Sequence, residues 1–542
     1  MKHSTHPEWI APFPLALISM ADTHASLSPP SRSPLAVFPA QSPALRFPSD
    51  LGAEQAGLYV LLALHALVWT LASGLYRSNL DWAGDMLENY VWGIEWQAGY
   101  HKHPPLFAWI TAAWFSVFPR TDLAYFALSN VNALVGLCGI AALARRFIPP
   151  GQAAVAALAM AVSPIYTTLA IKFNANTVLL SVWPWVAYCF VRYVQEGTRK
   201  LALALGAVAA LAMLGKYFSV VVLAGLAAAA MARPAWRARV LRPESLLVIM
   251  AGTIVLLPHV RWLLQSGMPT FTYARERMAE IEHPLAVVAA DMLAYALTQW
   301  AYLLPCMAFV LLMARQKRGH AARLMLLGFL RRSTDRDLWW LSMGTLLAIG
   351  VLALATRTRV SVLWGNAQWF AIVPLWLVIL RNGGVALDTR RIPRLMAAYW
   401  VVVLGVSALA GYMRVASHER LAVEPRAELA QAARAAWSRH MGTPLAIVAG
   451  NDKEARSIAF YGAGLTRYWE LFDPATTPWL SAADVRRQGA LFVCRAADES
   501  CRDAATSFSG VGPVAVDVAK RRWGVPLPAR RYLLYMMPGQ SS

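Results

Sequence analysis

Charged residues are scarce in this chain. Only 15% of its 542 residues are Asp, Glu, Lys or Arg, whereas a soluble chain of this length carries about a quarter. The apolar residues, 58% of the total, fall in blocks long enough to cross a bilayer, which takes roughly 20 residues per helix. The low charge therefore excludes an ordinary soluble globular protein and predicts a polytopic membrane protein.

Acidic residues are also outnumbered, since 50 Lys and Arg against 30 Asp and Glu give a formal charge of +20. In a soluble protein this excess would indicate a nucleic-acid partner. Here the basic residues gather in the connections that follow even-numbered apolar blocks. The positive-inside rule makes those connections cytoplasmic, so the amino terminus is expected in the cytoplasm and everything after residue 413 outside. We expect about eleven spans, near 56–76, 122–143, 152–170, 177–195, 200–214, 218–232, 246–264, 293–313, 338–355, 364–380 and 396–413.

The fifth and sixth spans are each short for a full crossing. If 200–214 and 218–232 formed one long helix, every later connection would change sides. The basic segment 233–242 would then lie outside, against the positive-inside rule. We therefore expect two separate helices.

Cysteine is rare, with five residues in the chain. Cys138, Cys189 and Cys306 fall inside expected spans and are best explained as small apolar fillers. Cys494 and Cys501 fall in the external tail, where a bacterial periplasm would permit a disulfide. Spacing alone leaves both the bridged and the free state open.

Regions outside the spans differ in character. Residues 1–54 are rich in Pro, Ser and His without a sustained period, which predicts a disordered cytoplasmic tail; a signal peptide at "WIAPFPLALISMA" is disfavoured by its two prolines. Residues 55–413 are expected to form the membrane domain. The pattern of residues 414–542 predicts a small external α/β domain. "AELAQAARAAWSRHM" has helical spacing, while "PLAIVAG", "GALFVC" and "RYLLYMMP" are typical of strands. We expect this domain to support the membrane part or to dock an acceptor.

The first external connection, "DWAGDMLENYVWGIEWQAGYHKHPPLFAW", concentrates the rarest residue types. Asp81, Asp85, Glu88, Trp92 and Glu95 recur at spacings of 4, 3, 4 and 3, which on a helix form one polar stripe. A helix of this kind lies along the membrane surface, and the double proline opens a second short helix. Two interpretations stay open: an interfacial helix pair with a solvated acidic face, or a carboxylate that acts as a general base.

The same connection resembles the first periplasmic loop of bacterial GT-C glycosyltransferases of the dolichyl-phosphate-mannose–protein mannosyltransferase type. That group includes the rhizobial lipopolysaccharide-core transferases and the lipid A aminoarabinose transferase. The matching residues are Gly84, Asp85, Tyr90, Trp92, Gly99, Tyr100, His103, Pro104, Pro105 and Leu106. Later fragments agree in order, among them "FNANT" and the Gly215-Lys216-Tyr217 run. The resemblance covers roughly residues 55–415 and implies a GT-C helical bundle, mainly α, with amphipathic periplasmic helices in its first loop.

The resemblance also implies a reaction. A sugar would pass, with inversion, from a polyprenyl-phosphate donor to a hydroxyl of a lipid, lipopolysaccharide or protein acceptor at the periplasmic face of the bacterial inner membrane. Asp85 would take the acceptor proton, alone or with Glu88. The family's acid after the aspartate is Met86 here, and the acid of its second external loop falls on Asn176. These two departures count against a two-carboxylate or metal-assisted scheme, and no cofactor is predicted, although a divalent metal stays open.

The leaving phosphate would need cations placed in advance. Candidates at the external rim are Lys102, His103, Lys216, Arg275, Arg277, Arg357 and Arg359, with Lys172 as a further cation. Lys216 could instead be a lysine that snorkels from a span end, and the arginines could be solvated. Side chains expected to line the substrate path are Trp92, Tyr100, Asn174, Asn176 and Tyr217; the aromatic ones could also be interfacial.

Several alternatives remain open. His101 and His103 with Glu88 could be metal ligands, although alternate residues of an extended segment point to opposite faces. A transporter or flippase for lipid-linked sugars would keep its ionisable groups near the bilayer midplane, whereas here they collect in external connections. A polysaccharide polymerase or ligase would place them in a late external loop, and a non-catalytic homologue would only bind the donor. The sequence does not name the sugar or the acceptor.

Overall fold

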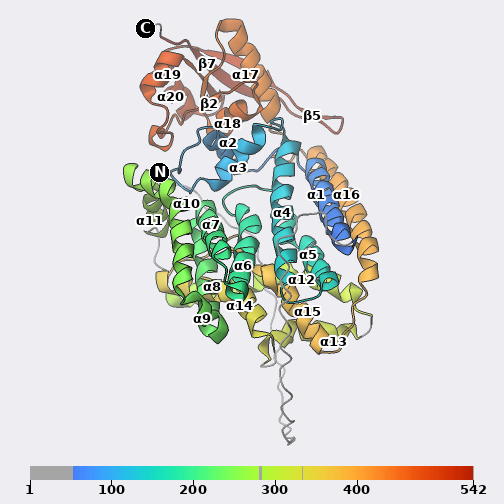
Figure 1. The fold of residues 1–542 in the computed structure, drawn as a ribbon. Helices are drawn as coiled ribbons and strands as arrows, with labels where there is room; N and C mark the ends of the chain where they lie inside the picture. The colour runs from blue at the N-terminus through green and yellow to red at the C-terminus, as the bar shows by residue number, and fades with distance from the viewer. Residues whose placement is uncertain (1–52, 280–282, 316, 332–333, 541–542) are drawn as a thin grey trace, which may run out of the picture. The chain divides into compact units, whose positions relative to one another are not determined.

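The structure is a computed structural model that describes residues 53–279, 283–315, 317–331 and 334–540 (Figure 1). The predicted tail of residues 1–54 therefore lies almost wholly outside the described residues. Residues 51–542 form one compact unit by their contacts.

Every expected span coincides with helical structure. The helices are α1 (Ala53–Tyr76), α4 (Asp122–Ala144), α5 (Pro150–Ala161), α6 (Val178–Glu196), α7 (Arg199–Gly215), α8 (Val220–Ala232), α10 (Leu246–Gln265), α12 (Leu285–Met313), α14 (Arg336–Thr356), α15 (Ile372–Asn382) and α16 (Ile392–Ala416). Within the described ranges, 6 helices are long and apolar enough to cross a membrane, or 7 if α8 and the bent α9 (Pro234–Val240) count as one. The predicted class, a mainly α multi-pass membrane protein, is confirmed, whereas the number of eleven crossings is not.

Two expected spans are broken. The prediction of one helix over 152–170 is wrong, because α5 ends at Ala161 and Pro164 starts a separate 3-10 turn, η2 (Pro164–Tyr166). At 1.5 Å per residue, the 12 residues of α5 reach about 18 Å, short of the roughly 30 Å hydrocarbon core. Likewise the block at 364–380 divides into η6 (Asn366–Ala371) and α15.

The fifth and sixth spans are two helices, as predicted. Between α7 and α8 the backbone is extended at Lys216 and then forms η3 (Tyr217–Ser219). The two helices have different neighbours, since α7 packs along α10 and α8 along α14. On another side of the bundle α1 lies between α4 and α16 (Figure 1).

The first external connection contains α2 (Asp85–Gly93) and α3 (Leu106–Phe115), which pack on each other. The expectation of a helix from residue 81 is wrong. The Asp81 carboxylate instead accepts hydrogen bonds from the backbone N–H groups of Asp85 and Met86, both at 3.0 Å, and so satisfies free donors at the start of α2. Gly84, with φ of +82°, turns the chain there, and α3 begins after Pro105 as the double proline predicts.

The carboxyl-terminal residues fold as the predicted α/β structure. A five-stranded sheet has the order β2 (Arg467–Tyr468), β1 (Ile447–Gly450), β3 (Ala490–Arg495), β7 (Arg530–Met537) and β4 (Pro513–Val518). β1 is parallel to β2 and β3, while β7 is antiparallel to its two neighbours. The helices α17 (Arg426–His440), α18 (Asp452–Tyr461), α19 (Ala482–Gln488) and α20 (Glu499–Ser509) belong to it, as does the hairpin of β5 (Arg521–Arg522) and β6 (Val525–Pro526). Cys494 and Cys501 form a disulfide, which decides between the two states left open above.

The remaining short helices connect these elements. They are η4 (Pro243–Ser245), α11 (Pro269–Ala279), α13 (Arg318–Leu327), η5 (Gly328–Leu330), η7 (Thr389–Arg391) and η8 (Pro474–Thr476).

The α/β part contacts α2 through α18 (Figure 1). Arg456 Nη1 lies 3.3 Å from Glu88 Oε1, and Arg467 Nη2 lies 2.5 Å from Glu95 Oε2. The Phe460 ring packs edge-on against Tyr90, with centroids 5.1 Å apart. Glu88 is only 7% exposed. The idea of a solvated acidic face is therefore wrong for Glu88 and Glu95, which pair with the α/β part.

Candidate functional site

Asp85 stands at the first turn of α2 and faces a loop from a different part of the chain. Its Oδ2 lies 2.8 Å from Nζ of Lys172 and accepts a hydrogen bond from Nδ2 of Asn174 at 3.1 Å. Lys172 and Asn174 belong to the segment between η2 and α6. The Asp85 side chain remains 38% exposed. The carboxylate is therefore held in place but is still open to an incoming group.

The loop that presents Asn174 is fixed by its own side chains. Asn174 Oδ1 accepts the backbone N–H groups of Asn176 and Thr177, at 2.9 and 3.2 Å. Thr177 Oγ1 donates to the carbonyl of Lys172 at 2.9 Å. The two bonds from Asn174 Oδ1 to the backbone groups that follow it are typical of Asx turns. Asn174 therefore both shapes the loop and donates to Asp85.

Lys172 serves two carboxylates, since its Nζ also lies 3.3 Å from Oδ2 of Asp81. Burial opposes ionisation of Asp85, but the Lys172 ammonium and the Asn174 amide outweigh it, so the pKa of Asp85 lies below its ordinary value. Burial would lower the pKa of Lys172, and the two carboxylates raise it instead. Both groups are charged at neutral pH.

Lys216 is the next cation of the site. It lies at the break between α7 and α8, and its Nζ donates to Oδ1 of Asn176 at 2.5 Å and sits 4.5 Å from the centroid of the Trp364 ring. Burial lowers its pKa to about 7. Neither partner is an anion, so the ammonium is only partly stabilised. Lys216 thus points into the loop that contacts Asp85, which favours the phosphate-binding interpretation over snorkelling.

His103 lies near the same charges. Burial, together with the ammonium groups of Lys216 and Lys102, lowers its pKa to about 3. The imidazole is therefore neutral at neutral pH and can exchange hydrogen bonds with a phosphate, but it adds no charge. Lys102, the other candidate from this turn, is paired with Glu88 at 2.9 Å.

Glu88 is in a different environment from Asp85. It contacts Lys102 and, across the boundary with the α/β part, Arg456. Arg456 Nη2 also lies 3.3 Å from Asp452 and 3.6 Å from Glu470. Glu88 is thus one carboxylate of a buried ionic cluster. Its contacts favour a role in positioning α2 rather than in proton transfer.

The four candidate arginines belong to α11 and to the segment just after α14. Arg275 is exposed on α11, and the side chain of Arg277 lies outside the described residues. Arg357 occupies the C-cap of α14 in a left-handed conformation, and Arg359 pairs with Asp291 at 2.5 Å. The structure therefore gives Arg275 and Arg359 no hydrogen bond or ion pair with Asp85 or the two lysines beside it.

Two of the aromatic candidates, Trp92 and Tyr100, are buried, and Tyr217 is half-buried. Trp92 and Tyr100 are buried and stack with centroids 5.0 Å apart, and the Tyr100 hydroxyl donates to the Trp92 carbonyl at 2.8 Å. The hydroxyl of Tyr217 is hydrogen-bonded to Nε2 of His259 at 2.6 Å and to Oγ1 of Thr270 at 3.1 Å. These contacts make Trp92 and Tyr100 a support for α2 and the turn after it.

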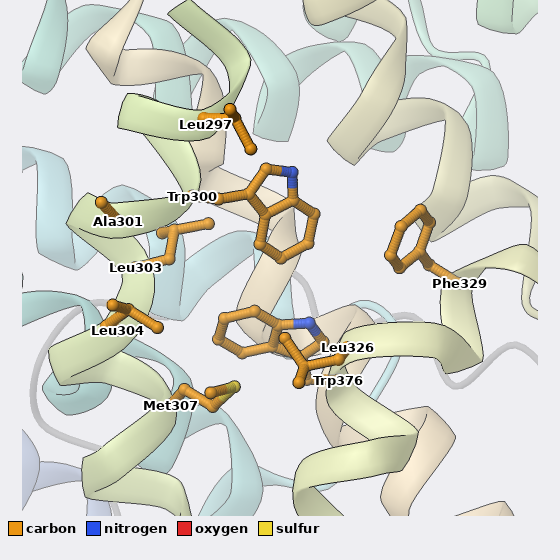
Figure 2. A pocket seen from close by; sticks show the side chains of 9 residues that line it. All are labelled: Leu297, Trp300, Ala301, Leu303, Leu304, Met307, Leu326, Phe329 and Trp376. Carbon is orange, nitrogen blue, oxygen red and sulfur yellow. The ribbon is translucent and has the colours of Figure 1, made fainter. Parts of the chain in front are cut away.

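Two cavities differ in chemistry. A small one of about 50 Å³ is lined by Lys172, Asn174, Asn176 and Asn366 together with apolar side chains. A larger one of about 330 Å³ is lined by Leu297, Trp300, Ala301, Leu303, Leu304, Met307, Leu326, Phe329 and Trp376, with the Trp300 and Trp376 rings side by side (Figure 2). Its lining carries no charged side chain, so the polar cavity beside Asp85 is the candidate site. Within the described ranges, no group of three or more His, Cys, Asp or Glu side chains could hold a metal ion.

Residues 102–262 match the model of the dolichyl-phosphate-mannose-protein mannosyltransferase family. The predicted resemblance is confirmed. The matched segment includes Lys172, Asn174 and Lys216 and begins after Asp85. Lipid A galacturonosyltransferase RgtD of Rhizobium johnstonii is 24% identical to the chain over 333 residues, which cover 59% of this chain and 66% of that protein.

Two solved structures are similar in coarse outline. ArnT from Cupriavidus metallidurans, in a crystal structure bound to undecaprenyl phosphate, is 15% identical, with 88% of this chain and 98% of that chain covered and a TM-score of 0.45. The oligosaccharyltransferase of Archaeoglobus fulgidus in its apo form is 10% identical, with 87% and 75% covered and a TM-score of 0.41.

Proposed function

We propose that this chain is an integral-membrane glycosyltransferase that moves a sugar from a polyprenyl-phosphate donor to a hydroxyl of a lipid A or lipopolysaccharide acceptor. One observation carries the proposal: the ionised, partly exposed carboxylate of Asp85 lies against Lys172 and Asn174, on the loop that Lys216 contacts. The family match and the lipid A relative support the reaction class and the acceptor. In the topology that the positive-inside rule favours, this site faces the periplasm from the inner membrane.

The residues divide the chemistry between them. The acceptor oxygen bonds to the anomeric carbon from the face opposite the phosphate, which inverts that centre. Asp85 takes the proton of the acceptor hydroxyl as this bond forms, and later releases it to water. The bond from the anomeric carbon to the phosphate oxygen breaks at the same time, so polyprenyl phosphate leaves with an additional negative charge.

Lys216 is placed to receive that charge. Its resting partners are an amide oxygen and an aromatic ring, and no described carboxylate forms an ion pair with it. An approaching phosphate favours the protonated form. A fixed cation that meets developing charge in a partly buried site stabilises the transition state. The neutral His103 can add a hydrogen bond. Lys172 has a second role, because it keeps Asp85 ionised.

The α/β part acts on this site through α2. Arg456 binds Glu88 on α2, the helix whose first residue is Asp85, and Arg467 binds Glu95 just after that helix ends. We infer that residues 55–413 form the catalytic membrane domain and that residues 414–542 hold α2 in position. The ionisable groups around Asp85 lie in connections between helices rather than within them, which argues against a flippase.

Replacement of Asp85 by Asn tests the proposal, because the amide keeps the shape and removes the base. Transfer of radiolabelled sugar from a polyprenyl-phosphate donor to lipid A should fall about 10²–10⁴-fold. The matched control is Asp517→Asn, which alters an exposed carboxylate paired with Arg531 in the α/β part and should leave transfer unchanged. Transfer by the Asp85→Asn variant at the control's rate would remove Asp85 from the mechanism.

A further inference from the structure

A second polar site lies at the external end of α1, beside an apolar groove. The groove, of about 400 Å³, runs between α1 and α16 and is lined by Trp69, Tyr76, Val406 and Ala410 among others. Arg77, the residue after α1, lines its polar end. The volume falls within the roughly 300–1,000 Å³ of ordinary ligand sites.

The guanidinium of Arg77 is poorly satisfied. Its Nη1 donates to the carbonyl of Leu80 at 3.3 Å, and its buried Nε has no hydrogen-bond partner among the described residues. Arg77 also forms no ion pair with a described carboxylate. The Asp81 carboxylate favours the charged guanidinium without direct contact, but burial outweighs it and lowers the pKa of Arg77. The planar fork of the guanidinium suits the oxygens of a phosphate.

Other cations surround the same end of the groove. Arg414, in the last turn of α16, packs over the Tyr76 ring at 4.4 Å and pairs with Glu419. Arg522, from the β5–β6 hairpin, donates to the carbonyls of Gly74 and Arg77 rather than to a carboxylate. The charge at the head of the groove is therefore complementary to an anion.

The dimensions match one leaflet. From Trp69 to Arg77 the groove follows α1 for eight residues, about 12 Å at 1.5 Å per residue, close to half of the roughly 30 Å hydrocarbon core. An acyl chain could lie along this length with its head group at Arg77. The much longer polyprenyl tail of the donor would exceed it.

The groove reaches the reaction site through residues different from those that surround Lys216. Thr168 and Ile171 line the groove, and the next residue, Lys172, holds Asp85. The polar cavity that Lys172 and Asn176 line shares no lining residue with the groove, and Lys216 binds Asn176 there. Two lipid-anchored molecules must reach one carboxylate in this reaction, and the chain offers two approaches to it.

We propose that the α1–α16 groove is the acceptor subsite, in which an acyl chain of a phosphorylated lipid acceptor lies along α1 and its phosphate binds Arg77. This inference rests on the proposed function. Arg414 and Arg522 add to the field that attracts the head group, while the acceptor hydroxyl extends past Ile171 toward Asp85.

Equilibrium binding to the full-length purified protein, with no sugar donor present, tests the proposal. The probes are lipid A and undecaprenyl phosphate, measured separately. Arg77→Gln should weaken lipid A binding tenfold or more, a loss of about 1.4 kcal/mol, and leave undecaprenyl phosphate binding unchanged, with Arg77→Lys restoring part of the loss. Weaker binding of undecaprenyl phosphate, or no change for either probe, would overturn the assignment.

A second pair of variants tests the groove without altering charge. Val406→Trp places a ring in the groove, whereas Val401→Trp alters a residue on the same helix that is 71% exposed and does not line the groove. Only the first should weaken lipid A binding. Equal losses in both variants, or equal displacement of lipid A by phosphatidylglycerol vesicles, would instead indicate a general membrane-lipid contact and contradict an acceptor subsite. Sugar transfer by the wild-type protein is scored separately, so failure of the subsite leaves the proposed function standing.

Discussion

Replacement of Arg456 by Met should release the α/β part from the first external loop. Arg456 is 11% exposed and lies within 3.6 Å of carboxylate oxygens of Glu88, Asp452 and Glu470. Methionine keeps much of the volume but leaves Glu88 and Glu470 buried together without this cation. Removal of one partner from a buried ionic cluster costs about 3–5 kcal/mol, and the more exposed Asp452 should add little.

The assay is thermal unfolding of the purified protein in detergent, followed by tryptophan fluorescence. One kcal/mol moves the midpoint by about 2–4 °C in a domain of 150–250 residues and by less in a longer chain, so the midpoint should fall by several degrees. Arg487→Met is the matched control, because Arg487 forms an exposed pair with Asp484 and surface changes stay within about 0.5 kcal/mol. If Arg456→Met unfolds at the same temperature as this control, the ionic cluster does not hold the α/β part on α2.

Three further predictions concern protonation and substrate binding. Burial raises the pKa of Glu470 from the ordinary 4.5 to about 7. Because this pKa is higher in the folded than in the unfolded protein, the stabilisation that protonated Glu470 contributes is complete below about pH 4.5 and is lost as the pH rises through 7. The unfolding temperature of Glu470→Gln should therefore decrease less between pH 5 and 8 than that of the wild type. An unchanged pH dependence would show that titration of Glu470 does not cause this decrease. Lys172→Met removes the cation that lowers the pKa of Asp85, so the acid limb of kcat/KM against pH should move to higher pH; an unmoved limb would show that Asp85 is not the titrating base. Lys216→Met should raise KM for the polyprenyl-phosphate donor more than KM for the acceptor, and equal increases would indicate a structural role.

Much of the fold could be predicted because the bilayer restricts what a chain can do. Backbone groups in lipid must be satisfied within helices, so apolar blocks locate the ends of α4 to within one residue and those of α1 and α16 to within four. The failures come from local competition. Pro164 ends the third block early, and Asp81 fits the helical spacing of the acids but caps α2 instead of joining it. Spacing alone does not distinguish a helical residue from a capping one.

The candidate site could be predicted only in parts. Asp85, Asn174, Asn176 and Lys216 were identified one by one from the resemblance, and the structure brings them to one loop. The contact between Lys172 and Asp85 joins two connections, and no local pattern predicts it. The positive-inside rule gives the side of the membrane for Arg275 and Arg359 but not their side-chain contacts, and Arg359 pairs with Asp291.

The same limit applies to the α/β part. Its strands follow from their buried apolar pattern, whereas its attachment to α2 depends on ion pairs and ring contacts between residues that are distant in the sequence. Arg456 and Glu88 each resemble an ordinary surface charge in the sequence, and only the fold reveals that both are buried.

The single-turnover rate of sugar transfer by Asp85→Asn, measured with donor and acceptor already bound, tests the central claim most directly. Under these conditions a loss of binding cannot imitate a loss of chemistry. We expect a rate about 10²–10⁴-fold below wild type, with both substrates bound as tightly as before. A variant that transfers sugar at the wild-type rate would show that proton removal does not depend on this carboxylate.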